Sequence, residues 1–132
     1  MNEAIETISE IYKAFAQGNV GKILSLLGEN FVIHLPKSLG GKHYGRGGIL
    51  EVVSKMCGTN NRLVKVITKS IEVEDSVIVF GHIELPEEIF HRQIVPYIDV
   101  WRSQDNRLIE VQVFYLDVEY INEYSNYIMK EH

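Results

Sequence analysis

The sequence lacks the features that mark several large classes of protein. Its single cysteine, Cys57, cannot form a disulfide within the chain, and no paired-cysteine or cysteine–histidine spacing indicates a zinc site. No hydrophobic run approaches the length of about 20 residues that is needed to span a bilayer. The segment 1–10 is acidic and has no apolar stretch of the kind found in a signal peptide. We therefore expect a cytoplasmic protein that does not enter a membrane and holds no metal.

Basic residues are also too few and too scattered to form a surface for nucleic acid. The chain has 13 Lys and Arg against 18 Asp and Glu, which gives a formal net charge of −5. Proteins that bind phosphate backbones carry clustered basic side chains, and no such cluster occurs between Lys13 and Lys130. The length of 132 residues and the hydrophobic content of 45% fit one domain over 1–132 with its own core.

The N-terminal part of the chain has a helical pattern. Apolar residues recur at helical spacing over 3–17. Gly18 suits the left-handed position that follows a helix, and Asn19 can cap a second, short helix rich in leucine and isoleucine. A third helix is predicted over 48–56, after a glycine-rich loop over 37–48.

The remaining segments have the pattern of β-strands. A short strand is predicted over 31–35, and longer ones over 63–74, 76–85, 90–103 and 108–117. Helices followed by neighbouring antiparallel strands predict an α+β fold, in which the N-terminal helices pack in the concave face of a curved antiparallel sheet. The long strands are apolar on both faces, so we predict that a second copy covers the outer face in a homodimer.

Three segments resemble the superfamily of ketosteroid isomerases and SnoaL-like polyketide cyclases. They are AFAQGN at 14–19, FVIHLP at 31–36 followed by YGR at 44–46, and the stretch from YIDVWR to YLD over 97–117. Together they extend over most of the chain. The resemblance implies the cone-shaped fold of nuclear-transport-factor-like proteins, a small apolar pocket between helices and sheet, and no cofactor.

The resemblance also implies which residues act in the pocket. Asp99 matches an acidic residue that helps ketosteroid isomerases to bind an oxyanion. The general base of that family falls at Leu35 and its helix tyrosine at Ile11, with Tyr12 about a hundred degrees around the helix. SnoaL-like cyclases use an acidic residue with a nearby histidine, and the predicted catalytic residues are therefore Asp99, Asp117 and His34.

Each of these candidates has an ordinary structural alternative. Asp99 shares a strand face with aromatic residues, where a carboxyl group that loses water becomes neutral and can donate to a developing oxyanion. The alternative is a strand aspartate paired with Arg102 or Arg92. Asp117 fits a general acid or base, or a helix cap. Strict alternation turns His34 outward if its neighbours line the pocket.

The pocket is predicted to hold a small apolar ligand. Its expected lining residues are Tyr12, Phe15, Ile33, Leu35, Met56, Trp101 and Tyr115. Three functions stay open: a cofactor-independent isomerase, cyclase or lyase acting on a carbonyl compound, a non-catalytic binding protein, and a dimerisation module of the same fold. An enclosed cavity that contains the Asp99 carboxyl group favours the first two, and a filled core favours the third.

Overall fold

The computed structural model describes residues 3–56, 64–84 and 94–116. The helices are α1 (Glu3–Gln17), α2 (Val20–Leu26) and α3 (Gly45–Met56), and a single 3-10 turn, η1 (Lys37–Leu39), lies before the third. The strands are β1 (Val32–His34), β2 (Lys42–Tyr44), β3 (Val64–Val73), β4 (Ser76–Glu84), β5 (Ile94–Gln104) and β6 (Arg107–Tyr115). Within these ranges no helix is long and apolar enough to cross a membrane.

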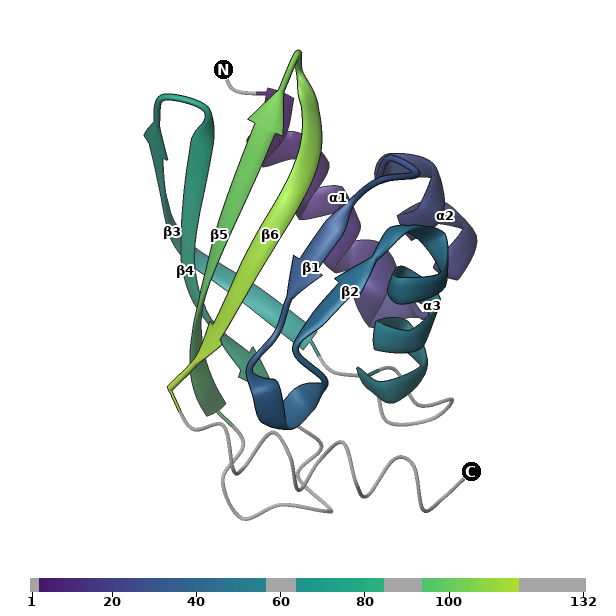
Figure 1. The fold of residues 1–132 in the computed structure, drawn as a ribbon. Helices are drawn as coiled ribbons and strands as arrows, with labels where there is room; N and C mark the ends of the chain where they lie inside the picture. The colour runs from purple at the N-terminus through teal and green to yellow at the C-terminus, as the bar shows by residue number, and fades with distance from the viewer. Residues whose placement is uncertain (1–2, 57–63, 85–93, 117–132) are drawn as a thin grey trace.

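The six strands form one curved, open sheet in the order β2-β1-β6-β5-β4-β3 (Figure 1). Neighbouring strands are antiparallel except β1 and β6, which pair in parallel. The helix α1 lies across one face of the sheet, with α2 and α3 beside it at the β1–β2 end (Figure 1). The predicted α+β architecture is confirmed, and the parallel pair is its one departure from an antiparallel sheet.

The helix boundaries follow the expected local chemistry. Gly18 has a φ of 68°, the left-handed conformation that glycine adopts at little cost after a helix. The side chain of Asn19 accepts a hydrogen bond of 3.1 Å from the backbone N–H of Lys22 and so caps α2. Both predictions are confirmed.

The predicted loop over 37–48 is wrong in two places. It contains the strand β2, which pairs with β1 through the register Ile33↔His43. The helix α3 also begins at Gly45 and not at residue 48. A strand of three residues is too short to show a period in the sequence, and its hydrogen bonds come from a partner strand that the local pattern does not reveal.

Side chains alternate cleanly across the central strands. The odd-numbered residues of β5 from Val95 to Trp101 are buried, as are Val111, Val113 and Tyr115 on β6. This face packs against the helices and contains the core. Asp99 belongs to it, with no exposed area, and so the predicted face of Asp99 is confirmed.

Gly81 on β4 allows one large core residue to reach across the sheet. Its register partner is Tyr97, whose hydroxyl donates a hydrogen bond of 3.3 Å to the backbone oxygen of Val66 on β3. A Cβ atom on Gly81 would lie 2.8 Å from that hydroxyl and would also overlap the Val66 oxygen. The missing side chain therefore lets the Tyr97 ring lie over β4.

We predict that Gly81→Ala destabilises the fold by about 1–3 kcal/mol, because the added methyl group displaces Tyr97 or opens the β3–β4 pairing. Chemical denaturation gives the free energy of unfolding. Gly47→Ala is the matched control, since a Cβ atom there meets nothing within 4 Å and the residue lies in α3. Equal stabilities of the two variants would contradict the role given to Gly81.

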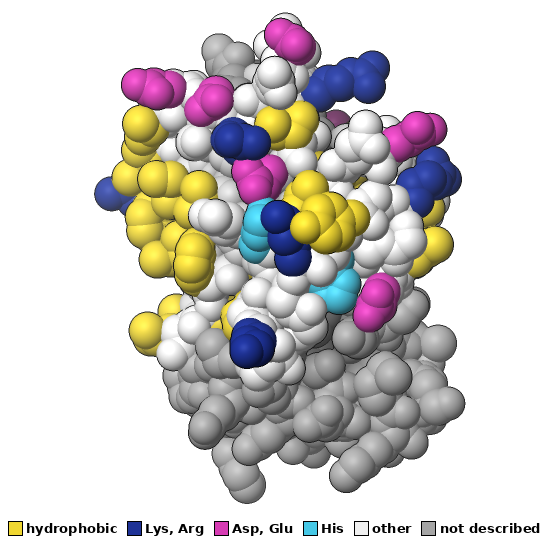
Figure 2. Space-filling view, in the orientation of Figure 1, with side chains coloured by type: hydrophobic (Ala, Val, Ile, Leu, Met, Phe, Trp, Pro, Cys, Tyr) yellow, Lys and Arg dark blue, Asp and Glu magenta, His cyan; other side chains and the backbone are white. Residues whose placement is uncertain are grey.

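The opposite face of the sheet carries exposed hydrophobic side chains. Ile98 and Phe114 are cross-strand partners and are 38% and 52% exposed. Figure 2 shows hydrophobic side chains gathered on one part of this face, beside basic, acidic and histidine side chains. Apolar patches of this kind mark contact surfaces, and we propose, as the sequence predicts, that a second copy of the chain covers it.

A charge placed within this patch tests the proposed homodimer. Phe114→Glu should yield a monomer in sedimentation velocity, because a buried carboxylate without a partner is costly at an apolar interface. Leu50→Glu, at an exposed leucine on α3, should leave the assembly unchanged. A parent chain that sediments as a monomer at all concentrations would overturn the proposal.

Candidate functional site

A small cavity lies between α1 and the buried face of the sheet. Its volume is about 70 Å³. Apart from Asp99 and Lys65, its walls are apolar or aromatic side chains, most of them from the helices and from β1, β5 and β6. A dry cavity of about 150 Å³ accommodates benzene, so the cavity as it stands holds a group smaller than such a ring.

Asp99 is the buried charge of this cavity. Its Oδ2 accepts a hydrogen bond from the hydroxyl of Tyr12 and another, of 2.6 Å, from Nζ of Lys65. The Lys65 side chain is only 10% exposed. Within the described residues Asp99 Oδ1 has no hydrogen-bond partner. One carboxylate oxygen is thus held by the protein, and the other is buried without a hydrogen-bond partner among the described residues.

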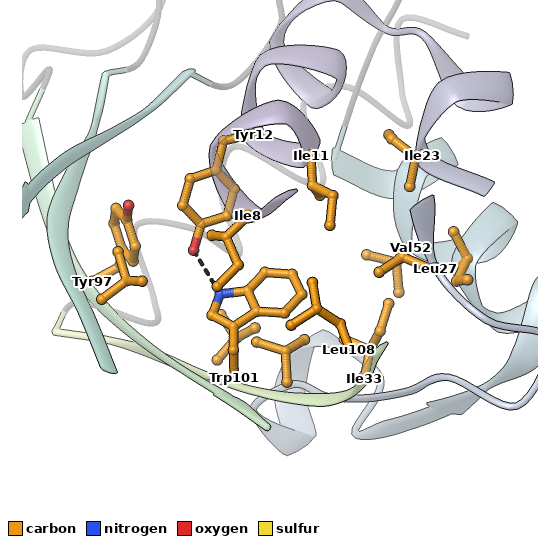
Figure 3. Close-up of a cluster of buried hydrophobic side chains, with 14 of the residues drawn as sticks. Ile8, Ile11, Tyr12, Ile23, Leu27, Ile33, Val52, Tyr97, Trp101 and Leu108 are labelled. Carbon is orange, nitrogen blue, oxygen red and sulfur yellow. Dashed lines mark hydrogen bonds between the residues drawn. The ribbon is translucent and has the colours of Figure 1, made fainter. Parts of the chain in front are cut away.

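Tyr12 connects this carboxylate to the aromatic core. Its hydroxyl accepts a hydrogen bond of 3.1 Å from the indole N–H of Trp101 while it donates to Asp99. Figure 3 shows the two side chains meeting, one from α1 and one from the sheet. The Tyr97 ring packs edge-on to Tyr12, with centroids 6.1 Å apart. The two consecutive hydrogen bonds, from Trp101 to Tyr12 and from Tyr12 to Asp99, fix the position of the carboxylate.

The buried tyrosines stay protonated. Burial, and then the negative charge of Asp99, raise the pKa of Tyr12 well above its ordinary value of about 10. The same two causes, in the same order, raise the pKa of Tyr97 and of Tyr115. These phenols are therefore hydrogen-bond donors and not bases, which leaves the Asp99 carboxylate as the proton acceptor among them.

The structure brings most of the predicted pocket residues together. The predicted lining residues that border the cavity are Tyr12, Phe15, Ile33, Leu35, Trp101 and Tyr115. The side chain of Met56 and the whole of Asp117 lie outside the described residues. In the described ranges no group of three or more His, Cys, Asp or Glu side chains is placed to hold a metal ion.

His34 does not line the cavity, which agrees with the outward position that strict alternation predicts and argues against its predicted catalytic role. Because side chains alternate along β1, His34 points to the opposite face of the sheet from Ile33. Its Nε2 lies 2.5 Å from Oε2 of Glu110, which also pairs with Arg102 at 3.1 Å. The predicted alternative partner of Asp99, Arg102, is thus engaged on the outer face.

A comparison of sequences establishes the family. The family described as "SnoaL-like domain" matches residues 8–111. The chain belongs to this SnoaL-like family. The match includes both Tyr12 and Asp99. No protein with a curated description matches the chain.

Solved structures share the fold of this SnoaL-like domain at low identity. An NTF2-like protein of unknown function from Burkholderia pseudomallei is 18% identical, with a TM-score of 0.75, and the match covers 92% of this chain and 96% of that one. TerC, crystallised with polyporic acid, is 23% identical, with a TM-score of 0.71 and coverage of 92% and 97%. IdmH, a candidate polyketide cyclase from Streptomyces antibioticus, is 19% identical, with a TM-score of 0.71 and coverage of 89% and 94%. At these identities the likeness concerns the fold alone.

The site contains two polar residues whose contact with Asp99 the sequence did not reveal. Counting along the helix gives Ile11 as the counterpart of the family tyrosine, yet it is Tyr12 that contacts Asp99. Lys65 was not singled out at all. One signal in the sequence could have identified Lys65. Because side chains alternate along β3, Lys65 shares the inward face with Ile67, and an unpaired lysine is rare on such a face.

The three buried tyrosines give a pH dependence with a definite sign. A group whose pKa is higher in the folded chain stabilises the fold below its unfolded value, and this contribution is lost as pH rises above that value. We therefore expect the free energy of unfolding to fall above about pH 10, by up to about 1.4 kcal/mol per pH unit for each such tyrosine.

Chemical denaturation at a series of alkaline pH values measures this slope. The variant Tyr115→Phe removes one of the three titrating groups and should give a shallower decline. A decline as steep as that of the parent chain would show that Tyr115 does not contribute.

Proposed function

We propose that this SnoaL-like domain is a cofactor-independent enzyme that moves a proton on a small, mostly apolar carbonyl compound, within the class of isomerases, cyclases and lyases. One observation carries the proposal. A carboxylate with no exposed area lines an apolar cavity, and one of its two oxygens has no partner among the described residues. Such an oxygen suits proton transfer, because no water competes for it.

The ion pair changes the role expected for Asp99. The sequence suggests a neutral carboxyl group that donates to an oxyanion. Both donors of the site, the Tyr12 hydroxyl and Nζ of Lys65, lie on Oδ2, and in the proposal the unpartnered Oδ1 accepts a proton. In the proposed step Oδ1 takes a proton from the carbon next to the substrate carbonyl, and the electron pair of the broken C–H bond moves into an enolate.

Charge balance supports this direction of transfer. Before the step the buried charges are the Asp99 carboxylate and the Lys65 ammonium, 2.6 Å apart. After it, Asp99 is neutral and the enolate carries the negative charge, while the ammonium remains in place. The sum of charges in the apolar site is zero throughout, so no uncompensated charge arises in a medium of low dielectric constant.

The fate of the enolate decides the reaction type. If Asp99 returns its proton to a different carbon, the product is an isomer. If the enolate attacks a second carbonyl group of the same molecule, a ring forms and the proton ends on the new alkoxide. His34 takes no part in either sequence, because it lies on the outer face of the sheet.

A non-catalytic binding protein is the second candidate, and the small cavity limits the ligand of either candidate to a small molecule. A volume of about 70 Å³ is well below the roughly 300–1,000 Å³ of common ligand pockets. Turnover of anything larger than a small ketone would need the cavity to widen. A free acceptor at Asp99 Oδ1 would also serve simple recognition of a ligand hydroxyl group.

Replacement of Asp99 by Asn separates the two candidates. In deuterated buffer, an active protein exchanges the hydrogens next to the carbonyl group of small ketones and diketones, which NMR follows directly. We expect Asp99→Asn to lower this exchange at least about 100-fold, the usual minimum contribution of a positioned acid or base.

Asp105→Asn is the matched control, since Asp105 is an exposed turn residue, and it should exchange at the parent rate. An undiminished rate in Asp99→Asn would refute the proposed base. Ligand binding without any exchange by the parent chain would support the binding protein.

A further inference from the structure

Three aromatic rings surround the ammonium group of Lys65. Its Nζ lies 4.5 Å from the ring centre of Tyr97, 5.2 Å from that of Tyr12 and 5.8 Å from that of Tyr115. The fourth neighbour is Asp99, at 2.6 Å. The rings come from α1, β5 and β6, and the lysine from β3. We call this arrangement of Tyr12, Tyr97, Tyr115 and Asp99 the tyrosine cage.

The tyrosine cage has the chemistry of a binding site for an organic cation. Aromatic faces within about 6 Å attract an ammonium group, and proteins use sets of such rings to recognise alkylated ammonium ligands. A carboxylate at hydrogen-bond distance adds a charged acceptor. A simple internal salt bridge would need only Asp99, whereas here three rings also face the cation.

We propose that the tyrosine cage is a subsite for an ammonium group and that Lys65 fills it from within the chain. Lys65 is then a specificity-determining residue: it excludes cationic ligands and leaves the cavity to neutral ones. The identity of the neutral ligand rests on the proposed function, but occupation of the cage by an ammonium group does not.

Removal of the lysine side chain should open the subsite to a matching ligand. In Lys65→Ala the missing atoms are Cγ, Cδ, Cε and Nζ, and n-propylammonium supplies the same four. We expect this ion to raise the Tm of Lys65→Ala in a saturable way, with half-saturation on the order of millimolar for so small a ligand. Sodium chloride at equal ionic strength and 1-propanol should have no such effect.

Lys69→Ala is the matched control, because Lys69 is an exposed lysine on the same strand. Neither this variant nor the parent chain should respond to n-propylammonium. A response of the parent chain equal to that of Lys65→Ala, or equal responses to n-propylammonium and 1-propanol, would overturn the proposal.

Lys65→Ala leaves the Asp99 carboxylate without its ion-pair partner and could fail to fold, so a second variant is needed. Lys65→Ala/Asp99→Asn lacks both charges of the ion pair and retains the three rings. This double variant should still prefer n-propylammonium to 1-propanol. It should bind n-propylammonium at least tenfold more weakly than Lys65→Ala, which retains the Asp99 carboxylate. Absence of that preference refutes the cage. Because every readout is binding, these results are independent of whether the parent chain exchanges ketone hydrogens.

Discussion

The ion pair between Lys65 and Asp99 is the interaction on which the interior of this domain depends. Two charges removed from water are stable only when their geometry is good and their remaining hydrogen-bonding capacity is used. Removal of one partner from such a pair typically costs about 3–5 kcal/mol, while an apolar replacement of both is often neutral or stabilising. The pair is therefore a constraint on the rest of the core more than a source of stability. Tyr12, which donates to Oδ2, and the cage rings around Nζ meet part of this constraint, while Oδ1 has no partner among the described residues.

The backbone of the sheet makes the pair possible. Lys65 belongs to the edge strand β3 and Asp99 to β5, with β4 between them. Gly81 on β4 has no side chain, and a Cβ atom there would lie 2.8 Å from the hydroxyl of Tyr97. The Tyr97 ring takes that space, donates to Val66 on β3 and forms one wall of the cage. One glycine thus links the packing of three strands to the position of the buried ammonium group.

Local sequence signals predicted the parts of this structure that depend on near neighbours. The helix over 3–17, the cap at Asn19 and the inward face of Asp99 follow from spacing, side-chain chemistry and alternation, and all are present. The strand β2, the parallel pairing of β1 with β6 and the contact of Lys65 with Asp99 depend on strand order and register, which no local pattern encodes. Tyr12 shows the same limit, because its reach depends on how α1 is rotated over the sheet.

The two oxygens of Asp99 explain why a chain would retain such a costly arrangement. Oδ2 is committed to Tyr12 and Lys65 and holds the carboxylate in place, while Oδ1 has no partner within the described residues. A purely structural aspartate would gain from a partner on each oxygen, since an unsatisfied buried acceptor costs about 1–3 kcal/mol. The neighbouring Tyr115 adds no further charge to the site, because burial and the charge of Asp99 raise the pKa of its phenol and keep it neutral. A fixed acceptor without a partner, on a residue that lines an apolar cavity, is what a ligand with a transferable proton would require.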